Sequence, residues 1–276
     1  MKEYNIDYEI SLGDFLKNNE KKWKNLLKYE KVAVNGVKVT NYHHILKKGD
    51  HVFLDTITKE IPKDLNIIYE DHEFIVIYKP SGLLRIATDK EKEKTLYHKV
   101  REYLHKKNEK VFVLHRLDKD TSGIVVFCKN EKLKVKMQKN WNNFVLKRFY
   151  VALIKGNVEK TGTLQNYIKE IGNKVVITTS KDEKKAITNY KVLKQNNKYS
   201  LIDIDLKTGR KNQIRVQFAH IGHPVIGDVK YGVKDDRLYL HAYEFSFMHP
   251  ITKKIFDFKV DIPSSFEKRM KNWIIF

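Results

Sequence analysis

Cysteine is nearly absent from this chain, and so are long apolar runs. Cys128 is the single cysteine among 276 residues, which excludes an internal disulfide and any zinc site built on cysteines. It lies in the apolar run GIVVFCKN, so we expect it in the core. No stretch approaches the ~20 apolar residues of a membrane-spanning helix. The opening MKEYNIDYEISL lacks the apolar segment of a signal peptide. We therefore expect a cytoplasmic protein that does not enter a membrane.

Arginine is also scarce, although positive charge is not. Only eight of the 54 basic residues are arginine, and the formal net charge is +20 at pH 7. Such a charge suits a polyanionic partner such as nucleic acid, but a general preference for lysine would produce it as well. Four of the eight arginines fall in three short windows, 115–123, 147–151 and 206–232. Because arginine offers a planar, bidentate fork that lysine lacks, these windows are the first candidates for a functional site.

Several motifs of RNA- and nucleotide-acting enzymes are missing. The phosphate-binding pattern GxxxxGK[ST] does not occur, and one cysteine cannot supply the Cys-x-x-Cys of a zinc base deaminase. Asp118 and Asp120 could suggest a magnesium nuclease, but no further acidic cluster accompanies them. Four histidines lack the regular spacing of metal ligands: His115, His220, His223 and His241. We expect their side chains to form hydrogen bonds that support the fold. No metal site is predicted.

Two of the arginine windows have the composition of loops that end a packed core. Residues 115–123 read HRLDKDTSG and offer the Asp118 carboxylate beside Arg116; residues 206–232 offer Arg210 and Arg215 among four glycines. A carboxylate in a partly buried site needs a nearby cation to stay ionised, and the two windows can supply that pair. From the local sequence alone, Asp118 is equally well read as a turn or helix-cap residue, because Thr-Ser-Gly follows closely.

The first part of the chain has the pattern of a separate small domain, 1–60. Helical spacing over 12–27 is followed by a hairpin at 32–39, where Asn-Gly suits a type I′ turn, and by a short strand at 51–54. This order resembles the α-L RNA-binding module. Its lysines can follow a phosphate backbone, and the candidates for RNA binding are Lys21, Lys24 and Lys28. Residues 1–60 carry 11 basic and 9 acidic residues, however, so a structural appendage is the alternative.

The second domain, 61–276, follows a linker at 55–66 and mixes strands with helices. Helices are predicted at 94–106, at 131–145 and from about 209 to 221. Neighbouring strands without intervening helices favour an α+β fold with a mixed, mainly antiparallel sheet flanked by helices. The strands predicted from apolar alternation are 74–78, 124–128, 150–154, 175–179, 186–193, 201–206 and 255–260.

Five segments taken in order resemble the RluA-type pseudouridine synthases, which convert selected uridines of RNA to the carbon-linked isomer. The segments are YKPSGL at 78–83, HRLDKDTSG at 115–123, RFYVAL at 148–153, TGRKNQIR with GHPVIGDVKYG in 208–232, and LHA with HP at 240–250. The resemblance covers nearly the whole chain. It departs at Asn212, where histidine is usual, and at Arg148, where lysine is commoner.

The resemblance implies a role for each matched residue. Asp118 corresponds to the essential aspartate, Tyr150 to the tyrosine that packs on the uracil, and Arg215 to the arginine that pairs with the aspartate. Arg116 corresponds to the arginine that replaces the flipped nucleotide in the RNA stack, and Arg210 is expected to bind RNA. We therefore expect a cofactor-free, monomeric enzyme acting on large-subunit ribosomal RNA, or on transfer RNA as the next choice. The alternative is a non-catalytic RNA-binding or ribosome-assembly factor, which would have no need of Asp118.

Overall fold

The computed structural model describes residues 2–21, 23–28, 30–54, 65–83, 95–232 and 234–271. Contacts divide the chain into two compact units, Met1–Pro62 and Lys63–Phe276. Most of the expected linker, 55–64, and the first residue of the helix expected at 94–106 lie outside the described residues. No helix in the described ranges is both long enough and apolar enough to cross a membrane.

The smaller unit combines a four-stranded antiparallel sheet with two helices. Strands β3 (Val32–Val34) and β4 (Val37–Lys38) are joined by a turn at Asn35 and Gly36. These two residues have φ values of 52° and 82°, and a type I′ turn requires positive φ at both positions. The hairpin predicted at 32–39 is therefore confirmed. The sheet order is β1 (Lys2–Asn5), β6 (His51–Leu54), β3 (Val32–Val34) and β4 (Val37–Lys38). The other elements are β2 (Ile10–Ser11), α1 (Leu12–Asn19), α2 (Trp23–Lys28) and β5 (Ile45–Leu46).

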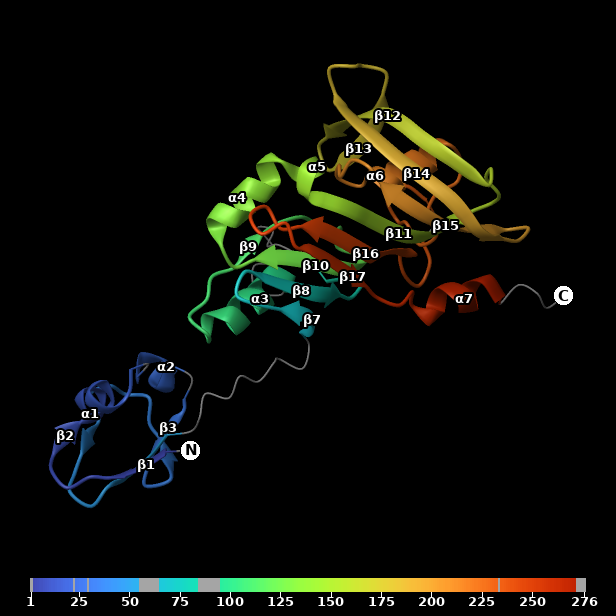
Figure 1. The fold of residues 1–276 in the computed structure, drawn as a ribbon. Coiled ribbons are helices and arrows are strands. Elements are labelled where there is room, and N and C mark those ends of the chain that lie inside the picture. Colours follow the sequence, from blue (N-terminus) through green and yellow to red (C-terminus); the bar gives the residue numbers. More distant parts are fainter. Residues whose placement is uncertain are drawn as a thin grey trace. The chain divides into compact units, whose positions relative to one another are not determined.

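The larger unit is built on an 11-stranded sheet with the order β13-β12-β14-β15-β11-β16-β10-β8-β7, to which β17 and β9 add at β16 and β10 (Figure 1). Among its described strand pairs, β10 with β16 is parallel and the rest are antiparallel, which confirms the predicted mixed sheet. The strands are β7 (Asn66–Glu70), β8 (Phe74–Lys79), β9 (Phe112–Val113), β10 (Ser122–Cys128), β11 (Val145–Lys155), β12 (Thr161–Ile171), β13 (Lys174–Thr178), β14 (Lys184–Gln195), β15 (Tyr199–Leu206), β16 (Leu240–Met248) and β17 (Ile255–Lys259).

Strand β10 shows why the sheet is covered on both faces. All seven of its residues are buried, and successive side chains of a strand point to opposite faces. Val125 and Phe127 join the cluster that contains α3 (Leu96–His105) and α6 (Gln213–His220). Cys128 joins the opposite cluster, and burial there raises the pKa of its thiol to about 12. Helices α4 (Glu131–Lys139) and α5 (Trp141–Phe144) cover that second face, and α7 (Ser264–Lys271) packs on a further cluster.

Two of the three predicted helices have different bounds in the structure. The helix expected at 131–145 is split at Asn140, whose φ of −121° and ψ of 41° lie outside the helical range, and strand β11 already begins at Val145. The helix expected from about 209 begins at Gln213, because Asn212 takes a left-handed conformation with φ of 51°. No strand was predicted at β1, β2, β5, β7, β9, β12 or β16, and no helix at α7. Strand β12 escaped notice because only one of its 11 residues is fully buried, so its apolar alternation is weak.

Candidate active site

The loop between β9 and β10 holds Asp118 at the edge of the core. The buried Lys79, at the end of β8, donates a hydrogen bond to this loop. The Lys79 Nζ donates hydrogen bonds to the carbonyl oxygens of Pro80 (3.0 Å), Leu83 (2.9 Å) and Lys119 (2.6 Å). Burial lowers the pKa of Lys79 to about 7, while nearby carboxylates oppose that change. Three carbonyl acceptors match the three N–H bonds of an ammonium group, so a protonated Lys79 can donate to all three.

The other end of the loop is held by close packing of two strands. Gly123 in β10 has a φ of 125°, and a Cβ there would lie 2.1 Å from the Ala242 carbonyl oxygen in β16. The parallel pairing of β10 with β16 begins at this point. The Ser81 hydroxyl also donates to the carbonyl oxygen of Asp120 at 2.6 Å. The backbone that follows Asp118, from Lys119 to Gly123, is therefore fixed by hydrogen bonds and close contacts to neighbouring segments.

Helix α6 brings Arg215 beside Asp118, as the sequence resemblance implied. The Arg215 Nη1 donates to Asp118 Oδ2 at 3.4 Å and to Asn212 Oδ1 at 3.3 Å. The side chains of Asp118 and Arg215 are 18% and 8% exposed, so this ion pair lies partly out of water. The left-handed conformation of Asn212 places its side-chain oxygen next to the guanidinium three residues later along the chain.

Arg215 has a stronger partner that the sequence analysis did not identify. Its Nε and Nη2 donate to the two carboxylate oxygens of Asp228, both at 2.7 Å, and the Asp228 side chain is fully buried. Backbone N–H groups of Lys230 and Tyr231 donate to the same carboxylate at 2.9 and 3.1 Å. Burial alone would lower the pKa of Arg215, but the hydrogen bonds and charge of Asp228, followed by those of Asp118, raise it above its ordinary value.

Asp228 could have been recognised as a candidate from its position. It stands in the glycine-rich window 206–232, between two glycines, and it is the only acidic residue of that window. Its spacing of 13 residues from Arg215 carries no helical or strand periodicity, so the pairing could not be derived from the sequence pattern.

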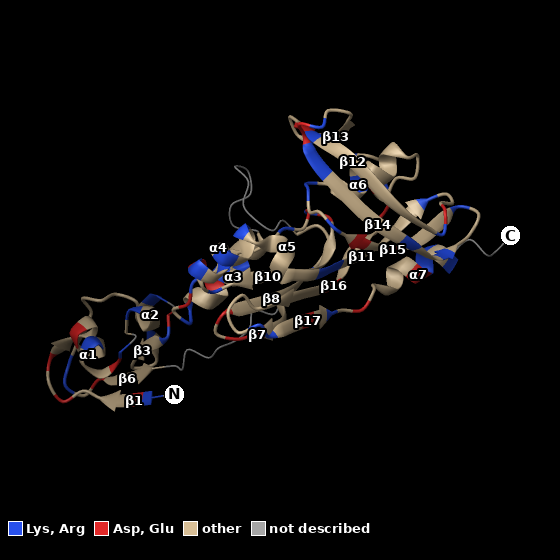
Figure 2. Ribbon diagram, turned by 45° about the horizontal axis from the view of Figure 1, so that its top comes forward, with Lys and Arg blue, Asp and Glu red and all other residues tan. Residues whose placement is uncertain are grey.

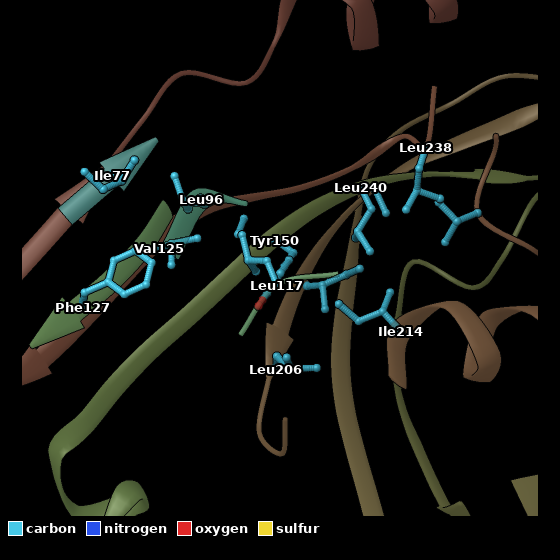
Figure 3. Packing of buried hydrophobic residues seen from close by; sticks show 14 of the residues in the cluster. Ile77, Leu96, Leu117, Val125, Phe127, Tyr150, Leu206, Ile214, Leu238 and Leu240 are labelled. Carbon is cyan, nitrogen blue, oxygen red and sulfur yellow. The ribbon is translucent and has the colours of Figure 1, made fainter. Parts of the chain in front are cut away.

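Strand β11 places Tyr150 on the wall of the same site. Figure 3 shows Tyr150 among Leu117, Ile214 and Leu240, which belong to one apolar cluster. Burial raises the pKa of Tyr150 to about 12, with a further increase from Asp118 that Arg148 opposes. The phenol therefore stays protonated at neutral pH and presents an uncharged ring and a hydroxyl group.

Arg148 and Trp141 were not among the predicted site residues, yet both line the cleft. The Arg148 guanidinium lies 5.9 Å from the centre of the Trp141 ring, and its Nη2 donates to the Lys207 carbonyl oxygen at 2.5 Å. A side chain at Gly209 would place its Cβ 2.7 Å from Arg148 Nη1, so the glycine makes room for the guanidinium. Burial lowers the pKa of Arg148. The signal for Arg148 was its place two residues before Tyr150, because alternate residues share one face of a strand.

These side chains surround one cleft of about 450 Å³. Its walls include all three residues predicted to be catalytic and both predicted RNA-binding arginines of the larger unit: Asp118, Tyr150, Arg215, Arg116 and Arg210. Arg116 and Arg210 are exposed at its rim. The predicted lysines of the smaller unit are also exposed, two of them on α2: Lys21, Lys24 and Lys28.

Two of the four histidines predicted to be scaffold, His115 and His241, make contacts inside the fold. His223 makes an exposed contact, with its Nδ1 2.9 Å from the Lys155 carbonyl oxygen, and His220 is exposed. The His115 Nε2 accepts a hydrogen bond from the Val126 backbone N–H at 3.0 Å, and its ring stacks on Phe245 at a centroid distance of 4.4 Å. The His241 Nδ1 lies 2.8 Å from the Ser122 hydroxyl, and burial lowers the pKa of this imidazole to about 4. Across the described ranges, no three His, Cys, Asp or Glu side chains gather as metal ligands would.

Several known proteins are similar to this chain. Residues 73–220 match the family model described as RNA pseudouridylate synthase. The chain is 33% identical over 261 residues to an uncharacterized RNA pseudouridine synthase of Mycoplasma pneumoniae, covering 87% of this chain and 84% of that protein. It is 29% identical to the tRNA pseudouridine synthase C of Vibrio parahaemolyticus, covering 75% of this chain and 94% of that protein. Human RNA pseudouridylate synthase domain containing 1 shares the fold, with a TM-score of 0.61, 23% identity, and coverage of 73% of this chain and 84% of that one.

Proposed function

Because the chain belongs to the RNA pseudouridine synthase family, we propose that its cleft isomerises particular uridines of a structured RNA, with Asp118 as the essential carboxylate. The observation that carries this proposal is the meeting of Asp118, Arg215 and Tyr150 in one cleft of about 450 Å³. Three separate segments of the sequence supply them, and a purely structural role would not need an acid beside this basic rim.

The reaction needs a fixed anion and no net redox change. The glycosidic bond from N1 of uracil to the ribose C1′ breaks, the base turns, and a bond from C5 to C1′ forms. C5 then loses its proton and N1 gains one, so atoms and charge balance. Asp118 can add to C6, capture C1′, or draw the proton from C2′; each route requires an ionised carboxylate. Arg215 places a positive charge beside Asp118 and orients its carboxylate through the 3.4 Å contact.

Tyr150 supplies the surface on which the base turns. Its ring forms part of the apolar wall, and aromatic side chains stack well on nucleobases. Since burial raises its pKa to about 12, the hydroxyl reaches the reaction protonated. It then serves as a hydrogen-bond partner in the transfer of the C5 proton.

The exposed arginines at the rim are placed to offset part of the free energy that is needed to expose the uridine. Taking a base out of a paired strand costs ~ a few kcal/mol, and an inserted side chain offsets part of that cost. Arg116 is exposed two residues before Asp118, so it is placed to fill the vacated position while the uracil occupies the cleft. Arg210 lies on the same rim and binds the RNA backbone.

The substrate RNA is the finer part of the proposal. We favour large-subunit ribosomal RNA, because the smaller unit presents exposed lysines on and before α2 that can follow a long, folded phosphate backbone: Lys21, Lys24 and Lys28. Transfer RNA is the alternative, supported by the similarity to a relative named for that substrate. A quarter of this chain lies outside that match, which is why ribosomal RNA is placed first.

The proposal is tested with unmodified transcripts of large-subunit ribosomal RNA fragments and of transfer RNAs. The wild-type chain should form pseudouridine at defined positions in one class, as mapped by sequencing after carbodiimide treatment. Asp118→Asn should abolish the product while RNA affinity stays within about threefold, since only the charge is removed. Residual turnover in this variant would rule out the role of Asp118, and product in neither class would rule out the substrates named here.

A further inference from the structure

A second cleft adjoins the first one in the larger unit. It has a volume of about 370 Å³ and is lined by residues of β12, β13 and β14 and of the turn before α6. The two clefts share four lining residues, Arg116, Gly209, Arg210 and Lys211. A strand of RNA that leaves the first cleft past these shared residues therefore enters the second.

The second cleft is lined by five cations and two carboxylates, Glu170 and Glu183. The Lys169 Nζ lies 3.3 Å from Glu183 Oε1, so this lysine already has an ion-pair partner. Lys169, Lys184 and Lys211 join the two rim arginines, and Figure 2 shows the corresponding concentration of basic residues where β14 begins. Inside this group, the Lys211 Nζ donates to Glu170 Oε2 at 2.8 Å. The side chains of Lys211 and Glu170 are 28% and 47% exposed, so both are accessible to a ligand.

The charges around Glu170 resemble those that hold a phosphate group. The hydrogen bond from Lys211 lowers the pKa of Glu170. Burial opposes this change, and the charges of Lys211, Lys184 and Arg116 each lower the pKa further. Carboxylates and phosphates are bound by the same charge-assisted hydrogen bonds from lysine and arginine. Glu170 thus already occupies a position among three cations that would otherwise be open to an external anion.

We propose that the second cleft binds a phosphate of the RNA strand next to the target uridine, and that Glu170 is a resident anion which this phosphate displaces from Lys211. This inference rests on the proposed function and extends it to the flank of the substrate. Any polyanion entering here must first break the contact between Lys211 and Glu170, so the cleft selects against RNA that does not also fill the first cleft. The free energy needed to break this contact lowers affinity for every RNA, and it thereby favours specificity.

The test compares two substitutions that remove the same charge from the ends of one strand. Glu170→Gln removes the resident anion, and Glu159→Gln is the matched control. Glu159 is exposed and lies just before β12, at the end opposite to Glu170 and about 30 Å away along the strand. The probe is a short RNA hairpin with uridines in its loop, and its binding to the full chain is measured by fluorescence anisotropy at about 50 and 200 mM salt.

Glu170→Gln should bind the hairpin about two- to fivefold more tightly at low salt, the size expected for an exposed ion pair. The slope of log affinity against log salt should steepen by roughly 0.7 to 0.9. In the wild-type chain the displaced Glu170 takes up counterions that offset those released by the phosphate, and the variant has no such offset. Glu159→Gln should change affinity less than about 1.5-fold, since its charge is screened at that distance. In a Lys211→Met background, the effect of Glu170→Gln should disappear.

Equal effects of the two glutamate substitutions, or a gain that persists without Lys211, would overturn the inference. These outcomes are separable from failure of the proposed function, because binding is measured without turnover. If the wild-type chain forms no pseudouridine, the proposed function fails. If it forms pseudouridine and Glu170→Gln binds no more tightly than Glu159→Gln, only the inference fails.

Discussion

Arg215 turns the bidentate face of its guanidinium toward Asp228, at 2.7 Å for both hydrogen bonds, and gives Asp118 a single contact at 3.4 Å. The buried Asp228 therefore sets the orientation of Arg215, and the remaining Nη1 faces the cleft. This division of partners leaves the Asp118 carboxylate beside a positive charge without fully occupying its oxygens, so the carboxylate stays available to a substrate.

The first prediction concerns Asp228→Asn. Removing one partner of a buried ion pair leaves the other charge uncompensated, so the free energy of unfolding should fall by about 3–5 kcal/mol. Pseudouridine formation should fall at least about tenfold, since Arg215 loses its orientation. Chemical denaturation and single-turnover assays below the midpoint of unfolding would measure the two effects. Normal stability with normal turnover would show that Asp228 does not hold Arg215.

The second prediction separates the ring of Tyr150 from its hydroxyl. Tyr150→Phe should retain RNA affinity within about twofold, because the stacking surface is unchanged. Its rate of pseudouridine formation should fall by about 10²-fold if the hydroxyl assists proton transfer. The wild-type rate should show no loss from Tyr150 ionisation below about pH 10, since burial raises the pKa to about 12. An unchanged rate in Tyr150→Phe would limit this residue to stacking.

The third prediction concerns the pH dependence introduced by Lys79. Its pKa is lowered to about 7 from an ordinary value of 10.5. As pH rises through 7, the folded lysine loses a proton and with it one of the three donors that anchor the loop beside Asp118, so the turnover rate should decline. The decline should be absent from Lys79→Met, whose rate is expected to be low at every pH.

The contribution of Lys79 to stability should change with pH in the opposite direction to its effect on rate. Between pH 7 and 10.5 the unfolded lysine keeps its proton while the folded one has released it, so the unfolded state binds more protons. The free energy of unfolding should then rise with pH, by at most about 1.4 kcal/mol per pH unit, relative to Lys79→Met. Denaturation of both proteins at several pH values would measure this difference, and parallel profiles would show that Lys79 does not titrate in this range.

The fourth prediction concerns RNA binding by the smaller unit. The variant carries glutamine in place of three exposed lysines, Lys21, Lys24 and Lys28, in the full chain. Its binding to a large ribosomal RNA fragment should weaken more than its binding to a short hairpin. The slope of log affinity against log salt should become shallower by up to about 2.7 for the large RNA, since each lost phosphate contact contributes ~0.9. An equal loss with both RNAs would instead indicate a general charge effect.

The sequence predicted most elements whose pattern is local. The Asn35-Gly36 turn, the fully apolar run of β10 and the Asp118 loop each depend on residues within a few positions of one another. Resemblance to a family added the meeting of Asp118 with Arg215, which no spacing could have supplied. Local reasoning failed where polar side chains decided the outcome, as in the weakly alternating strand β12 and at Asn212, whose left-handed backbone delays the start of α6.

The sequence by itself determined the charge, the mixed sheet and the two loops that carry Arg116, Arg210 and Arg215. Only the tertiary structure decided which acid takes the fork of Arg215, that Trp141 and Arg148 line the cleft, and that Glu170 stands among the cations of a second cleft. The reason is physical. A hydrogen bond between side chains is sensitive to changes of a few tenths of an ångström in distance and to direction. Residues that sheet pairing brings together also have no fixed separation along the chain.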